Sequence, residues 1–382
     1  MSFDQISLIL QLCFILFEVM VLTVIISNLR ILRRLGDYPL PTGWPKVSIL
    51  VPARNEADNI GPCVRSLQQQ QYPAFEILVL DDHSTDDTWQ HLCALASDDD
   101  RLHIRKGDPL PPGWLGKHWA CHQLAQRAKG ELLLFTDADT RHHPLMLRDS
   151  VAAIIDEEAD LLTALPHEET GSWGENLVIP ILLWCIMAFV PLGLAYRLRL
   201  PALSATIGQF MLFRRAAYKK IGGYASIRDE VVDDLALGRR TKAFGLRWRL
   251  ADGGQRISCR MYKNFGEVFA GLSKNLYAVF GNKPLPFLFA WSWITVVFWG
   301  PFITLGLALS GVSLSPITLT LTGLAIALAL LIWSLIHWRF GFPRYLPLLY
   351  PVTILLATLI ALRSMILTRQ GQTTWKGRVL AH

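Results

Sequence analysis

Two kinds of hydrophobic pattern divide the chain. Long apolar runs lie near its two ends: the first extends from Ile6 to Ile26, and the later ones cover 287–309, 317–336 and 346–367. Each is close to the roughly 20 residues that a helix needs to cross the hydrocarbon core of a bilayer. From Pro45 to about Phe280 the apolar runs are much shorter. The pattern therefore predicts a folded domain between one N-terminal and about three C-terminal transmembrane segments.

The central region alternates short β-branched or leucine-rich runs with amphipathic segments, which is typical of an α/β domain with a parallel sheet. Turn and cap residues precede several of the amphipathic segments, as Ser84 and Thr85 do for the second. We expect strands at 47–52, 75–80, 132–136, 161–165 and 210–213, and helices at 58–70, 85–96, 117–128, 144–157 and 232–243.

The charges that flank the apolar runs predict how the chain is oriented in a membrane. Asp4 precedes the first run and arginines follow it, which indicates an uncleaved anchor (1–35) with its C-terminal side in the cytoplasm. The uncharged turn 310–316 is expected outside and the basic loop 339–344 inside. A full last crossing would place the basic tail (369–382) outside, against the positive-inside trend. Prolines near the start of that segment leave a bent or re-entrant course open.

One apolar segment, 176–200, lies inside the predicted α/β domain (45–255). It is interrupted by Pro180 and Pro191, and a crossing there would split the domain between two compartments. We expect the segment to lie on the membrane surface, with Arg197 and Arg199 at lipid headgroups. A buried pair of hydrophobic helices is the alternative. The basic and aromatic stretch 256–284 is expected to be an amphipathic interface segment ahead of the membrane segments 285–368.

Composition agrees with a mixed soluble and membrane protein. Of the 382 residues, 52% are hydrophobic, and the mean hydropathy is +0.31. The net charge of +6 resides largely beside the apolar runs, without a Lys/Arg run interleaved with aromatics. The six cysteines form no CxxC pair and have no histidines at zinc spacing. We therefore expect no nucleic-acid partner, no disulfide scaffold and no structural zinc.

Polar residues follow the first two predicted strands at their carboxyl ends, where open parallel sheets bind ligands. The first strand leads into Pro52-Ala53-Arg54-Asn55-Glu56, and the second into Asp81-Asp82-His83-Ser84. A carboxylate at the second strand end can accept a hydrogen bond from the imide N–H of uracil or from a ribose hydroxyl. Asp82 or Ser84 could equally cap the following helix.

The third strand leads into Asp137-Ala138-Asp139. Two carboxylates separated by one residue at a strand end can converge on one hard cation. A Mg or Mn ion held by one or two carboxylates can bridge the two phosphates of a nucleotide diphosphate sugar and neutralise the leaving diphosphate. Asp137 and Asp139 are therefore the predicted metal ligands.

A further acidic pair, Asp233-Asp234, opens the last predicted helix of the domain. Glycosyl transfer needs a base that takes the acceptor proton, and a carboxylate near the metal can serve. The alternative is that acids in the first turn simply favour the helix dipole. We expect the base to be Asp234 rather than Asp233.

These elements, in this order and spacing, resemble the family 2 glycosyltransferases of the GT-A fold, over about Val47 to Gly245. The resemblance implies a Rossmann-like domain that binds a nucleotide diphosphate sugar together with Mg or Mn. It implies that Asp82 binds uracil, that Asp139 binds the metal and that Asp234 is the base. The same resemblance places the donor pocket at Pro52, Arg54, Glu56, Lys117 and Asp137, with Asp81 beside Asp82. Lys117 could otherwise be an exposed lysine at a helix start.

A narrower likeness extends over nearly the whole chain. The segment 112–120, the run 208–215 ahead of Gly222-Gly223, and the tail 375–378 resemble membrane-bound carotenoid (diaponeurosporenoate) and hopanoid-associated glycosyltransferases. This likeness implies an isoprenoid acceptor that enters from the bilayer, in an inner (plasma) membrane protein whose catalytic domain is cytoplasmic. Tyr224 stands where members of this group often have histidine.

Two other functions stay open. A polyprenyl-phosphate glycosyltransferase would use an acceptor that is already an anion and needs no strong base. A non-catalytic nucleotide-sugar-binding membrane subunit would need neither the Asp-x-Asp pair nor the base. The Gln-x-x-Arg-Trp motif of processive polysaccharide synthases does not follow Asp234, so a single transfer is expected.

Overall fold

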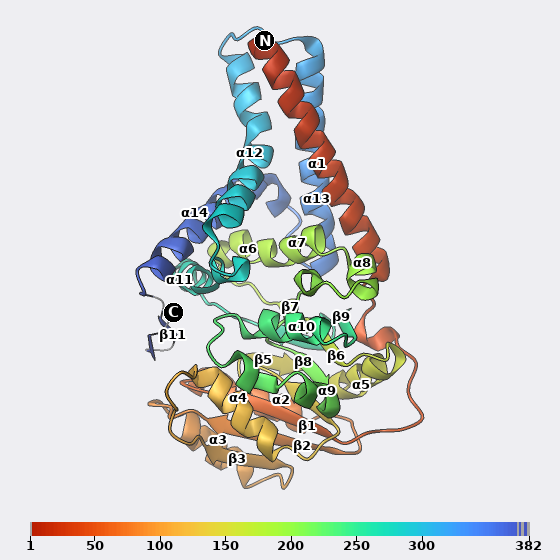
Figure 1. The fold of residues 1–382 in the computed structure, drawn as a ribbon, viewed down its shortest axis with the longest axis vertical. Helices are drawn as coiled ribbons and strands as arrows, with labels where there is room; N and C mark the ends of the chain where they lie inside the picture. The colour runs from red at the N-terminus through yellow and green to blue at the C-terminus, as the bar shows by residue number, and fades with distance from the viewer. Residues whose placement is uncertain (1, 373, 376–377, 380–382) are drawn as a thin grey trace. The chain divides into compact units, whose positions relative to one another are not determined.

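The computed structural model describes residues 2–372, 374–375 and 378–379 (Figure 1). The chain forms two compact units, each assembled from segments that are distant in sequence. The helical unit consists of Met1–Arg30, Thr170–Pro191 and Tyr262–Gln370. The sheet unit consists of Ile31–Glu169, Leu192–Met261 and the residues from Gly371 onward.

The sheet unit is built on a seven-stranded sheet in the order β3-β2-β1-β4-β8-β6-β9. All the strands expected from the sequence are present, and β3 and β9 were not foreseen. The strands are β1 (Val47–Ala53), β2 (Phe75–Asp81), β3 (Leu102–Lys106), β4 (Leu132–Phe135), β6 (Leu161–Leu165), β8 (Met211–Arg214) and β9 (Trp248–Asp252).

The expectation of a purely parallel sheet is wrong for one strand. β1, β2, β3 and β4 pair in parallel, but β8 runs antiparallel to both β4 and β6. Parallel neighbours need a right-handed crossover, usually a helix that packs on the sheet. β8 is instead reached by the long connection from 166 to 210, which includes Thr170–Pro191 of the helical unit. The sheet is therefore mixed.

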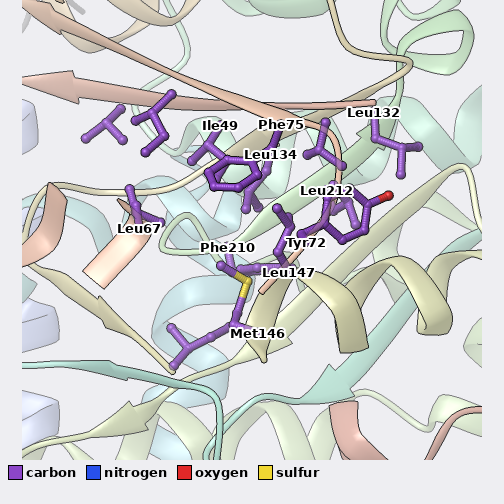
Figure 2. Packing of buried hydrophobic residues seen from close by; sticks show 14 of the residues in the cluster. Ile49, Leu67, Tyr72, Phe75, Leu132, Leu134, Met146, Leu147, Phe210 and Leu212 are labelled. Atoms are coloured by element: carbon purple, nitrogen blue, oxygen red, sulfur yellow. The ribbon is translucent and has the colours of Figure 1, made fainter. Parts of the chain in front are cut away.

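Helices cover both faces of this sheet, so its central strands are buried throughout. On one face, Val47, Ile49 and Val51 share a core with α2, α3 and α5; Figure 2 shows Ile49 and Leu134 near Leu67, Met146 and Leu147. The opposite face packs against α4 and α9. These helices are α2 (Ala57–Gln68), α3 (Thr88–Ala96), α4 (Gly116–Arg127), α5 (Met146–Asp156) and α9 (Arg215–Lys220).

The helices begin close to the predicted positions, and the differences have local causes. α3 begins at Thr88 rather than Thr85 because the Asp86 carboxylate accepts hydrogen bonds from the Thr88 N–H and Oγ1, which holds the preceding residues in a turn. The remaining elements of the unit are η1 (Leu35–Asp37), β5 (Thr140–His142), β7 (His167–Glu168), α8 (Leu192–Arg197), η2 (Pro201–Leu203), η3 (Gly223–Ile227), α10 (Asp233–Ala243), β10 (Ile257–Cys259), β11 (Thr374–Trp375) and β12 (Arg378–Val379).

The helical unit contains helices that are long and apolar enough to cross a membrane. There are four among the described residues: α1 (Phe3–Ile31), α12 (Pro284–Leu309), α13 (Pro316–Phe340) and the segment Leu346–Arg369, which comprises η5 (Leu346–Leu349) and α14 (Tyr350–Arg369). One lies near the N-terminus and the others follow the sheet unit in sequence, as predicted. The shorter helices are α6 (Trp173–Val178), α7 (Pro180–Phe189), α11 (Phe265–Asn275) and η4 (Ala278–Phe280).

The apolar segment predicted at 176–200 divides into two parts. In α7 most side chains are buried, with Trp184 and Met187 fully so, and this part fits the alternative of buried hydrophobic helices. A helix that is apolar on all sides needs neighbours on all sides. From Leu194 to Leu200 the apolar side chains are largely exposed beside Arg197 and Arg199, so the membrane-surface location stays a prediction for this part alone.

Candidate active site

A cavity of about 150 Å³ opens where the carboxyl ends of β1, β2 and β4 meet. The strand order reverses beside β1, which is where doubly wound sheets bind nucleotides. Pockets that enclose a whole small molecule usually measure about 300–1,000 Å³, so this one accounts for only part of a nucleotide sugar. Its lining residues are Pro52, Ala53, Arg54, Glu56, Asp82, Lys117, Ala120, Asp137, Ala138 and Asp139.

The loops after β1 and β2 hold each other in place at the cavity. Asn55 and His83 both have left-handed backbones, with φ of 50° and 55°, a conformation that costs energy for residues other than glycine. The Asn55 N–H donates to Ser84 Oγ at 2.9 Å, and the Asn55 side-chain oxygen accepts from the Thr85 N–H at 2.8 Å. These bonds fix the cavity wall before any ligand binds.

The structure distinguishes the two acids that follow β2. Asp82 lines the cavity, where the Arg54 guanidinium donates to its backbone carbonyl and lies 3.9 Å from its carboxylate. Asp81 does not line the cavity: its carboxylate accepts from the Ser84 N–H at 3.3 and 3.4 Å. Asp81 therefore helps to shape the turn that presents Asp82, and its contact with the donor stays a prediction.

Lys117 contacts both acidic motifs, Asp137-Ala138-Asp139 and Asp233-Asp234, although about a hundred residues separate them in sequence. Its Nζ lies 2.8 Å from Asp137 Oδ1 and 3.6 Å from Asp233 Oδ2. Burial alone would lower the pKa of Lys117, but the Asp137 and Asp233 carboxylates raise it, so the ammonium stays charged. It is thus not the exposed lysine that the sequence left open.

Asp139 is the carboxylate best placed to hold a divalent cation. Its Oδ1 is buried and has no hydrogen-bond partner among the described residues, whereas Asp137 Oδ1 is already engaged by Lys117. Burial, with the Asp137 and Glu56 charges, raises the pKa of Asp139 to about 7. Within residues 2–372, 374–375 and 378–379, no three His, Cys, Asp or Glu side chains form a complete metal site. Mg²⁺ commonly takes one or two carboxylates and completes its shell with phosphates and water, so this donor set fits.

The predicted base, Asp234, lies at the start of α10, just beyond the cavity lining. Its carboxylate accepts from the Gly208 N–H at 2.9 Å and from the Leu235 N–H at 2.7 Å. A Cβ on Gly208 would lie 3.4 Å from Asp234 Oδ2 and 3.5 Å from Lys117 Nζ, so the Gly208 backbone lies beside both charged groups. Burial and the adjacent Asp233 raise the pKa of Asp234 to about 7, which suits a general base near neutral pH.

Asp233 is held in a different way from Asp234. The Tyr224 hydroxyl donates to Asp233 Oδ2 at 3.0 Å. Burial alone would raise the pKa of Asp233, but Lys117 and His118 hold it below its usual value. Asp233 is therefore an ionised partner of Lys117, and Asp234 stays the predicted base.

The sequence offered little sign that Tyr224 and His118 belong to this site. The Tyr224 ring packs edge-on against buried His118, and the Tyr224 N–H donates to the hydroxyl of Tyr218. At Gly223, a Cβ would lie 2.5 Å from the Tyr218 ring, and φ is +51°. The Gly222-Gly223 pair was the available signal, because it allows the close turn that brings Tyr224 to Asp233.

We expect Lys117→Met to lower the stability of the sheet unit. The change leaves Asp137 and Asp233 without their shared cation. Breaking a fully buried pair costs about 3–5 kcal/mol, and this site is partly exposed, so about 2 kcal/mol is expected. Thermal unfolding of the full chain in detergent measures the loss, with Lys106→Met as a control on an exposed lysine. Equal unfolding temperatures for the two variants would contradict the bridging role.

Comparison with known proteins agrees with this geometry. The family model described as glycosyl transferase family 2 matches residues 48–222. Two 4,4'-diaponeurosporenoate glycosyltransferases of Staphylococcus aureus, from strains MRSA252 and USA300, are 27% and 26% identical over 246 residues. Each match covers 62% of this chain and 63% of the relative, so the chain spans less than two thirds of these relatives' length.

A solved structure extends the comparison to the fold. A mannosyltransferase from Pyrobaculum calidifontis, solved with GDP-Man and Mn²⁺, superposes with a TM-score of 0.61 at 19% identity, covering 94% of this chain and 99% of that one. The matched family, the strand order 3-2-1-4 and the acids at three strand ends agree with one another. Residues 48–222 therefore belong to the family 2 glycosyltransferases and adopt the GT-A fold.

Proposed function

We propose that the protein is a membrane-bound glycosyltransferase. It moves a sugar from a nucleotide diphosphate sugar, a UDP-hexose in the leading form of the proposal, to a lipid acceptor such as a carotenoid or another isoprenoid. The transfer depends on Mg or Mn and inverts the anomeric carbon. The protein would lie in the inner (plasma) membrane with the sheet unit in the cytoplasm.

One observation carries the catalytic part of the proposal. Acids from separate strand and helix ends gather around Lys117: Asp137 directly, Asp139 in the same cavity, and Asp233 on the other side of the ammonium. A nucleotide-binding subunit without activity needs no such arrangement. The four long apolar helices and the lipid-modifying relatives support the membrane and the acceptor class.

The chain's own residues suggest how the reaction would proceed. Asp82 and the strained loops would hold the nucleoside end of the donor, and Lys117 would lie beside the diphosphate. A divalent ion on Asp139 would supply charge neutralisation for the leaving diphosphate. Ionised Asp234 would take the proton of the acceptor hydroxyl as its oxygen attacks the anomeric carbon, and the diphosphate would leave from the opposite face.

A transfer assay tests the proposal. Purified full-length protein is incubated with radiolabelled UDP-glucose, UDP-galactose, UDP-N-acetylglucosamine or GDP-mannose, together with total lipid extract and Mg²⁺ or Mn²⁺. We expect one donor to label a product in the organic phase, and a chelator to prevent the labelling. The proposal fails if every donor leaves the lipid fraction unlabelled, or if the labelling survives both chelation and the Asp139→Asn change.

A further inference from the structure

The helical unit contains a polar cluster that the proposed reaction does not use. Glu18, on α1, is completely buried, and neither of its carboxylate oxygens has a hydrogen-bond partner among the described residues. The buried donors without a partner in the described part of the chain include the indole N–H groups of Trp184 and Trp333 and the hydroxyl of Tyr350. Unpaired polar groups in an apolar interior cost free energy, and an acid at membrane depth is a sign of function.

The three donors belong to one ring stack. Trp184 and Trp333 are stacked with centroids 5.3 Å apart, and Tyr350 also stacks on Trp333, at 6.4 Å. Phe298 packs edge-on against both Trp184 and Tyr350. We call Glu18 and these four rings the Glu18 cluster. Its rings come from α7, α12, α13 and α14, and Glu18 comes from α1, so five helices position it.

The packing of α1 on α12 brings Glu18 to the stack. Gln11 donates to Thr304 Oγ1 at 3.0 Å, and one turn further along α1 the Phe14 ring lies against Gly300, where a Cβ would be 2.5 Å away. The two helices therefore run antiparallel, and the next turn of α1 places Glu18 level with Phe298. The neighbouring Phe17 ring packs against Phe189, which in turn packs edge-on against Trp184 of the stack.

The cluster also lies at the N-terminus of α14, inside the helical unit. Tyr350 opens α14 and stacks on Trp333, about two turns or ~10 Å before the end of α13 at Phe340. The Trp299 indole, about four turns into α12, donates to the Pro351 carbonyl. At its other end, α14 packs on α11 and the Ser364 hydroxyl accepts from the Tyr277 N–H. α14 thus starts part way along α12 and α13, and from there it runs back to α11 (Figure 1).

We propose that α14 is a re-entrant helix and that the Glu18 cluster binds the hydroxyl or carboxyl group of a long-chain lipid. A helix N-terminus attracts electron-rich oxygen. A neutral Glu18 carboxyl offers one donor and one acceptor, and the ring stack offers three donors, which together satisfy a hydroxyl or carboxyl group. A phosphate group fits poorly, because no Lys or Arg occurs in the stretches that build the cluster, which are 14–21, 180–189, 291–302, 329–337 and 347–357.

The re-entrant course also answers a question of topology that the sequence left open. With α14 entering and leaving on one side, Arg369 returns to the side of the basic loop 339–344, and the positive-inside trend is satisfied. The proposal goes beyond the glycosyl transfer, because it concerns a lipid site in the helical unit. The test of the lipid site measures lipid binding rather than sugar transfer, so the lipid-site proposal and the proposed glycosyl transfer can fail independently.

Carbodiimide labelling tests the site. Dicyclohexylcarbodiimide reacts with neutral carboxyls in apolar surroundings, and peptide mass spectrometry locates the adduct. In full-length protein in nanodiscs, we expect hexadecan-1-ol at ten times its half-protecting concentration to slow labelling of Glu18 about tenfold, since only the unbound fraction reacts. Hexadecane, which has the same chain without the hydroxyl, should not protect. Hexadecanoic acid is tested in the same way. Stronger protection by the acid than by the alcohol would show that the site prefers a carboxyl group to a hydroxyl group.

Variants and a second probe make the result decisive. Tyr350→Phe keeps the ring but removes the hydroxyl, and should raise the half-protecting concentration about fivefold to tenfold. Met20→Leu, on the exposed face of α1, should leave it unchanged. A hexadecanol with a diazirine beside the hydroxyl should cross-link to peptides of α1 and α14. Equal protection by alcohol and alkane, or cross-links confined to other helices, would overturn the site.

Discussion

Replacing Asp139 with asparagine should lower kcat/KM for sugar transfer by about 10³-fold, the loss seen when one preorganised charge partner is removed from a transition state. The amide keeps the volume of the side chain but removes the charge from Asp139 Oδ1, a buried carboxylate oxygen that has no hydrogen-bond partner among the described residues. Transfer is measured with saturating donor over a range of Mn²⁺ concentrations. The concentration of Mn²⁺ needed for half-maximal activity should rise together with the loss of rate.

The control for this change is Asp100→Asn, which makes the same substitution at an exposed acid away from the cavity. It should leave both the rate and the Mn²⁺ dependence unchanged. Asp137→Asn should have a different effect from both of these changes, because the Asp137 carboxylate is paired with Lys117. It should lower stability as well as activity. If Asp139→Asn kept the wild-type Mn²⁺ dependence, the assignment of the metal to Asp139 would be wrong.

Replacing Asp234 with asparagine should lower kcat by about 10²–10⁴-fold, the usual contribution of a general base, while donor binding in the presence of metal is retained. Asp234 lies beside Lys117 and Gly208 but outside the lining of the donor cavity, so its loss should affect the chemical step and not the affinity. Single-turnover rates and the Kd of the nucleotide sugar separate these effects. A lowered donor affinity with an unchanged single-turnover rate would contradict the role of base.

The acceptor distinguishes this mechanism from that of a polyprenyl-phosphate enzyme. With a hydroxyl acceptor, the Asp234→Asn variant should lose nearly all turnover. With a phosphate acceptor, which is already an anion, the loss should be small. If the Asp234→Asn variant transferred sugar to a polyprenyl phosphate at the wild-type rate, the result would favour a polyprenyl-phosphate glycosyltransferase.

The pH dependence of sugar transfer is expected to follow the ionisation of Asp234. Because burial and Asp233 raise the pKa of Asp234 to about 7, activity should rise as the pH increases through that value and then level off. A carboxyl with a raised pKa in the folded protein stabilises the fold at low pH, and this contribution is lost as the group ionises. Above about pH 7, the asparagine variant should therefore unfold at no lower a temperature than the wild type, so lost activity there cannot be attributed to unfolding.

Much of the fold could be predicted because the signals are local. The apolar runs near 6–26 and 287–367 identified the long helices of the helical unit, and the alternation from Val47 onward identified the strands that form the centre of the sheet. Periodicity and run length depend only on neighbouring residues. β3 was missed because its sequence, Leu102–Lys106, is short and mostly polar, as suits a strand at the edge of a sheet.

The site was predicted in part for a related reason. Asp82, Asp137 and Asp139 follow strands whose carboxyl ends must meet at one edge of a parallel sheet, and they do line one cavity. Asp81 was included because it is adjacent to Asp82 in sequence, although successive residues at a strand end point in different directions. Tyr224 and His118 gave no comparable signal, since the hydrogen bond from Tyr224 to Asp233 and the packing of Tyr224 on His118 depend on the turn at Gly223.

By itself, the sequence determined which segments are helices and strands, which helices are apolar enough for a membrane, and which acids follow which strands. The tertiary structure alone decided that β8 runs antiparallel, that Lys117 pairs with both Asp137 and Asp233, and that Trp184 and Trp333 stack with Tyr350 at the start of α14. The first group of properties depends on residues within a few positions of one another. The second depends on contacts between residues up to hundreds of positions apart, and only the packing of the folded chain fixes which of these contacts form.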